Sequence, residues 1–96
     1  MNVAGLYRKA LRQAEFGRFD AAESTLREVL AGTKTGEVAR VRALVVLGDL
    51  LCGVGRETEA MPLLESALRE GSADDLDDLL DHELARAREL LDGHRG

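Results

Sequence analysis

The chain has 96 residues, of which 45% are hydrophobic, so it is long enough for one folded domain and too apolar for an intrinsically disordered chain. Its net charge of −5 disfavours nucleic acid as the main ligand. The single cysteine excludes an intramolecular disulfide, and with no leader-like segment or long apolar run we expect a cytoplasmic protein without a membrane partner.

Two helices are predicted in the first third of the chain. The first covers about residues 2–15, where apolar residues recur at a spacing near 3.6. These are Tyr7, Ala10, Leu11 and Ala14. A second helix follows Gly17, and Asp20 with Glu23 three residues later is a capping-box-like pair that predicts its start.

Three more helices are predicted in the rest of the chain. The segment at about 37–53 is the most apolar, so we expect it at the buried centre. Gly48 lies in its interior, where glycine costs about 1 kcal/mol relative to alanine, which suggests that another helix backbone passes close by. A fourth helix is predicted at about 58–70. Ser72, with an acidic residue three positions later, predicts the start of a fifth helix over about 74–92.

The turns between these helices are self-similar. Gly17 and Gly55 are 38 residues apart, and each ends one amphipathic stretch and opens another. An alanine follows each glycine by five residues, at Ala22 and Ala60. A unit repeated in this way cannot bury its apolar face alone, so the pattern predicts stacked helical hairpins.

Apolar residues and glycines surround Gly55 in a fixed order. They are Leu44, Leu47, Gly48, Leu51, Ala60, Leu64 and Ala67. This order resembles a tetratricopeptide repeat, which has a large residue, a Leu-Gly pair and a second large residue on its first helix, then alternating small and large residues on its second.

The first copy departs from the family's pattern. Lys9 and Gln13 stand where the first helix of a repeat is expected to be apolar. Shifting that helix by one residue restores an apolar stripe, so we predict that the turn at 16–18 is one residue shorter than usual.

The resemblance implies an all-α fold in which antiparallel helical hairpins stack as a short right-handed solenoid of about five helices. The whole chain, 1–96, would be one domain. Its parts would be a first repeat at about 4–34, a second at about 37–71, and a half repeat or capping helix at 74–92.

The resemblance also implies a binding face. Tetratricopeptide stacks bind segments of other proteins on a concave face that their first helices line. Transferred to this chain, the face comprises Arg8, Arg12, Glu15, Arg42, Val45, Asp49, Cys52, Asp77 and Asp81. We therefore expect a non-catalytic adaptor or scaffold that binds another protein or peptide. The alternatives are a self-associating module, such as a homodimer, or an accessory or regulatory subunit of a biosynthetic enzyme.

The charge along the chain is uneven. Residues 1–48 hold eight basic and five acidic side chains, a balance of +3, whereas residues 49–96 hold five and thirteen, a balance of −8. An acidic end of a partner is therefore expected near the first helix. Eleven arginines against two lysines are typical of a GC-rich bacterial genome.

No residue pattern predicts catalysis. The aspartates between 74 and 81 lack the glycine turn and terminal glutamate of an EF-hand, so we expect no metal. Cys52 has no histidine nearby in sequence, and the glycines at 48–55 lack the lysine of a phosphate-binding loop. We expect no cofactor.

Overall fold

The computed structural model describes residues 2–72 and 79–95, and within these ranges it contains five helices and no strand. The helices are α1 (Val3–Glu15), α2 (Phe19–Ala31), α3 (Val38–Gly53), α4 (Glu57–Ser72) and α5 (Asp81–Arg95). The predicted all-α class is confirmed. None of these five helices has the length and apolar character needed to cross a membrane.

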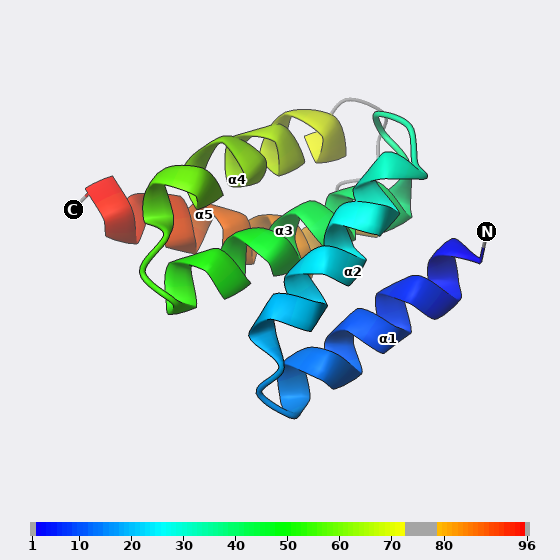
Figure 1. Ribbon diagram of the computed structural model, residues 1–96. Coiled ribbons are helices and arrows are strands. Elements are labelled where there is room, and N and C mark those ends of the chain that lie inside the picture. The colour runs from blue at the N-terminus through cyan, green and yellow to red at the C-terminus, as the bar shows by residue number, and fades with distance from the viewer. Residues whose placement is uncertain (1, 73–78, 96) are drawn as a thin grey trace.

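The helices form two hairpins and a single fifth helix (Figure 1). α1 packs antiparallel to α2, and α3 packs antiparallel to α4. α2 also packs on α3, while α5 lies against both α3 and α4. As a result α3 touches all four other helices, as expected for the most apolar segment of the sequence.

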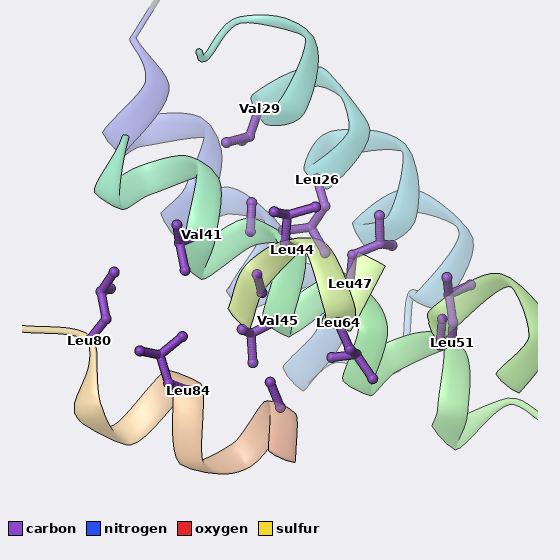
Figure 2. Close-up of a cluster of buried hydrophobic side chains, with 14 of the residues drawn as sticks. Leu26, Val29, Val41, Leu44, Val45, Leu47, Leu51, Leu64, Leu80 and Leu84 are labelled. Atoms are coloured by element: carbon purple, nitrogen blue, oxygen red, sulfur yellow. The ribbon is translucent and has the colours of Figure 1, made fainter. Parts of the chain in front are cut away.

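The core is aliphatic and continuous across the array (Figure 2). Leu26 of α2, Leu64 of α4 and Leu84 of α5 surround α3, which supplies the largest share of buried residues. Each fully buried leucine contributes about 1.5 to 3 kcal/mol relative to an exposed one. α1 contributes a single buried residue, Ala10, so it is held mainly by its hairpin contact with α2.

The turns at Gly17 and Gly55 have the same geometry. Both glycines have positive φ, 74° and 83°, a conformation that only glycine adopts without cost. In each turn the amide after the glycine donates to the carbonyl five residues earlier, the pattern of a Schellman motif. These bonds join Arg18 N–H to Gln13 O and Arg56 N–H to Leu51 O, both at 2.8 Å.

The predicted one-residue shift of the first helix is therefore wrong. With turns of equal length, Gln13 of α1 is equivalent to Leu51 of α3, and Lys9 is equivalent to Leu47. Gln13 is half-buried, and its Oε1 accepts a 2.7 Å hydrogen bond from Thr25 Oγ1 of α2. A polar side chain thus fills the apolar place without leaving an unpaired group. Lys9 is exposed and keeps the outer side of α1 polar.

Two predicted helix starts are also wrong. α2 begins at Phe19, one residue before Asp20, and its cap makes no side-chain hydrogen bond. The carboxylate of Glu23 binds arginines instead of the helix start. Ser72 is the last residue of α4, and α5 begins at Asp81. Part of the predicted 74–92 helix lies outside the described residues.

A neighbouring side chain occupies the space where a Cβ at position 48 would lie, whereas we expected a neighbouring helix backbone there. A Cβ at Gly48 would lie 2.5 Å from Cδ2 of Leu64 on α4, closer than carbon atoms pack. Because Leu64 is fully buried, it has no free space into which to move. The absent side chain at Gly48 therefore allows α3 and α4 to pack closely.

We expect Gly48→Ala to lower the free energy of unfolding by about 1 to 2 kcal/mol, because overpacking costs about 1 to 3 kcal/mol and exceeds the gain in helix propensity. Gly53, also in α3, is the matched control, since nothing lies within 4 Å of its Cβ position. Gly53→Ala should leave stability unchanged or raise it by up to about 1 kcal/mol. Urea denaturation measures both, and equal effects would contradict the packing described.

A largely buried ion pair joins the two helices of the second hairpin, and its arginine links them to the first hairpin. Glu70 of α4 is 6% exposed and accepts a hydrogen bond from Arg40 Nε of α3 at 3.0 Å. It also accepts one from the backbone N–H of Gly36 in the loop before α3, at 3.1 Å. Arg40 donates in turn to the carbonyl of Leu30 near the end of α2, at 3.2 Å. One carboxylate and one guanidinium thus fix α2, α3, α4 and the connecting loop.

Glu70→Ala should lower the free energy of unfolding by about 3 kcal/mol, because it leaves Arg40 with an uncompensated charge in a partly buried place. The control is Arg27→Ala, which breaks an ion pair with Glu23 spaced four residues apart on one helix. Arg27 is about half exposed, so its loss should cost only about 0.3 to 0.5 kcal/mol. Similar losses in the two variants, measured by chemical denaturation, would show that Glu70 does not hold α3, α4 and the loop before α3 together.

Candidate partner-binding cleft

An open cleft of about 610 Å³ lies over α3, between α1 and α5. It exists because α1 and α5 both pack on α3 but not on each other in the described part of the chain. Its lining is mostly apolar. The lining residues are Tyr7, Leu11, Ala14, Phe19, Val45, Val46, Asp49, Leu50, Gly53, Val54, His82, Glu83 and Arg86.

One strip of α1 forms the first wall. Tyr7, Leu11 and Ala14 follow each other at intervals of four and three residues, which places them on one face of the helix. All three are half-buried. Tyr7 also packs against the buried core, whereas Leu11 is not among the side chains that do so. Leu11 therefore contributes to the cleft and little to the fold.

The floor and one end of the cleft are apolar as well. Val45 is buried in the floor, and Val46 and Leu50 beside it are half-buried. At the end nearest the two glycine turns, Phe19 and Val54 are each 46% exposed. Large apolar side chains grouped at an open cleft mark a surface suited to binding.

Ion pairs form the wall on α5. Arg86 donates from Nε and Nη2 to the two carboxylate oxygens of Asp49 on α3, at 3.1 and 3.0 Å, and this pairing raises the pKa of Arg86. Glu83 accepts a hydrogen bond from Arg42 Nε of α3 at 2.9 Å. The two pairs hold α5 on α3. They also neutralise the charged side chains that α3 and α5 bring to the cleft.

A second hollow, of about 380 Å³, adjoins the cleft at Tyr7. It lies between the first halves of α1 and α3, and its lining includes Ala4, Arg8, Val38, Ala39 and Arg42. Tyr7 lines both hollows, so the hollowed surface extends along α1 toward its first turn. Arg8 is exposed at this end.

Four of the nine residues predicted for the binding face lie at these two hollows. Val45 and Asp49 line the main cleft, and Arg8 and Arg42 line the adjoining one. The charges of Asp49 and Arg42 are, however, already paired with residues of α5. Only Arg8 presents a charge at the cleft without an ion-pair partner among the described residues.

The other five predicted residues are placed elsewhere. Arg12, Glu15 and Asp81 are exposed and line none of the hollows described here. Cys52 lies at a separate hollow beside α5, where burial, with Glu57 and Asp49, raises the pKa of its thiol. Asp77 lies outside the described residues.

The sequence interpretation missed most of the apolar lining. Tyr7, Leu11 and Ala14 were predicted only as part of the apolar stripe of the first helix, since periodicity shows that a stripe is apolar but not what covers it. The sequence did contain a signal for the cleft lining. α1 has a second apolar stripe, through Leu6 and Ala10, and this second stripe makes the contact with the buried core. In the described part of the chain, no three His, Cys, Asp or Glu side chains are grouped to hold a metal.

Comparisons with family models, with curated proteins and with solved structures found no match for this chain. The resemblance to tetratricopeptide repeats therefore rests on the residue pattern.

Tyr7 offers a direct test of the cleft. Burial raises the pKa of its phenol above the usual value of 10.0, the Glu83 carboxylate raises it further, and Arg42 opposes them. The chain has one tyrosine and no tryptophan, so an ultraviolet titration reports Tyr7 alone. We expect a midpoint above 10.0 that Glu83→Gln lowers, because the nearby negative charge is lost.

The matched control for this titration is Glu89→Gln, on the same helix but outside the cleft lining. It should leave the Tyr7 midpoint unchanged, and circular dichroism at each pH verifies that the helices persist. A midpoint that Glu83→Gln does not move would contradict the placement of α1 opposite α5.

Proposed function

We propose that the protein is a non-catalytic adaptor of the tetratricopeptide type, which holds a segment of a partner protein in the cleft over α3. The observation that carries this proposal is the unused apolar wall of α1. Leu11 lines an open cleft but does not pack on the buried core, so folding alone gives no reason for a leucine there. A partner's apolar side chains would cover it.

The repetition of the turns supports the family part of the proposal. The hydrogen bonds around Gly17 recur around Gly55 with an offset of 38 residues. The same offset relates Ala22 to Ala60, and both alanines are fully buried. The cleft lies among the first helices of the successive units, α1, α3 and α5, which are the helices that line the concave face in this family.

The outer surfaces of the array favour a different protein as the partner, and they argue against end-to-end stacking of copies of this chain. On α1 the exposed residues include Lys9 and Glu15, and on α5 they include Arg88 and Asp92. Charged surfaces of this kind are poor sites for a stable interface, whose centre is depleted in charge. The cleft is the more apolar surface.

Leu11→Arg should abolish capture of the partner from native cells, because a charged side chain would occupy the apolar wall, while the melting temperature stays within a few degrees. The matched control is Leu79→Arg, the same change at a residue that is 57% exposed and outside the cleft lining. Affinity capture with mass spectrometry compares wild type and both variants. Partners that Leu11→Arg retains in full would contradict the proposal.

Light scattering on the same proteins tests whether a second copy of this chain occupies the cleft. If wild type doubled in mass with concentration and Leu11→Arg did not, the cleft would be assigned to self-association and the adaptor proposal would fail. Capture of a biosynthetic enzyme as the cleft-dependent partner would make the protein an accessory subunit.

A further inference from the structure

The cleft offers few free hydrogen-bonding groups. Apolar side chains form its α1 wall, its floor and the end at Phe19 and Val54. The charged groups that α3 and α5 contribute are paired with each other, as Asp49 is with Arg86, and the remaining polar side chains in the lining are Tyr7 and His82. The helix backbones around it are bonded internally, since each N–H within a helix binds a carbonyl four residues earlier, except in end turns such as the start of α2 at Phe19.

The small number of free hydrogen-bonding groups restricts which ligands can bind in the cleft. An extended segment carries an N–H and a C=O on every residue, and each needs a partner when it leaves water. A polar backbone group buried without one costs about 1 to 3 kcal/mol. A helix satisfies these groups within itself and presents only side chains. The lining of this cleft therefore suits a helix and penalises an extended peptide.

The dimensions agree with a short helix. From Ala4 to Ala14, the cleft and its adjoining hollow follow α1 for ten residues, which is about 15 Å of helix. A partner helix of about three turns spans that length. Its apolar anchors would recur at i, i+3 or i+4, and i+7, as in other helices that bind in grooves.

The charges favour one orientation. Arg8 lines the hollow at one end of this surface. It is exposed and forms no ion pair within the described residues. The opposite end, at Phe19 and Val54, is apolar.

Resting on the function proposed above, we infer that the occupant of the cleft is an amphipathic α-helix of a partner protein. Its apolar face lies against Leu11 and Val46, and its acidic end lies at Arg8. Helix formation on binding and the acidic end together distinguish this occupant from other peptides that fit an apolar cleft.

The test uses a display library of random peptides of about 16 residues, or about 24 Å as a helix. The library is selected on wild type and counter-selected on Leu11→Arg, with Leu79→Arg as the matched folded control. Enriched peptides are synthesised, and circular dichroism measures whether each gains helix on binding. We expect apolar residues at helical spacing, acidic residues clustered at one end, and a gain of helix.

The outcomes separate the inference from the proposed function. Peptides that need Leu11 but contain alternating apolar residues or internal proline, and gain no helix, would overturn the helical occupant and leave the adaptor proposal standing. Selected peptides that bind wild type and Leu11→Arg equally well would overturn both the helical occupant and the proposed function.

Charge reversal tests the orientation with the same peptides. Arg8→Glu should slow association at low salt by about threefold or more, an effect that high salt removes. Arg88→Glu changes the net charge equally, on an exposed residue of α5, and should have a much smaller effect. Equal slowing by the two variants would overturn the predicted orientation.

Discussion

The structure depends on the burial of α3. This helix is apolar around most of its circumference, and its seven buried residues face every other helix of the array. A helix of that kind is unstable in water and must be surrounded. Gly48 then sets how closely α4 approaches, because Leu64 occupies the space where a Cβ would lie. The pair of Arg40 and Glu70 joins α3 to α4 and to the loop before α3, and Arg40 also binds the end of α2.

The cleft is a consequence of the same arrangement. In the described part of the chain four helices pack around α3, and α1 and α5 both contact α3 but not each other. The ion pairs from Asp49 to Arg86 and from Arg42 to Glu83 secure α5 without covering the floor. The helices of the described chain therefore pack together while one apolar surface stays open.

Several elements of the fold follow from local chemistry and were predicted from the sequence. Gly17 and Gly55 end helices because a left-handed residue closes the last turn, and this requirement is the same wherever the turn lies. The buried stripe through Ala60 and Leu64 follows from helical periodicity. The cap signals at Asp20 and Ser72 were wrong, because a capping residue type also occurs inside a helix whose tertiary contacts extend it.

The sequence by itself determined an all-helical array, its two glycine turns and a central apolar helix, since these depend on neighbours within a few residues. Only the tertiary structure decided which apolar residues are core and which line the cleft. Leu11 and Ala10 are adjacent and both apolar, yet Ala10 is buried and Leu11 faces the open space between α1 and α5. The pairing of Glu70 with Arg40, 30 residues away, could not be predicted from the sequence either. Such contacts are set by the crossing of helices, which no spacing along one chain segment encodes.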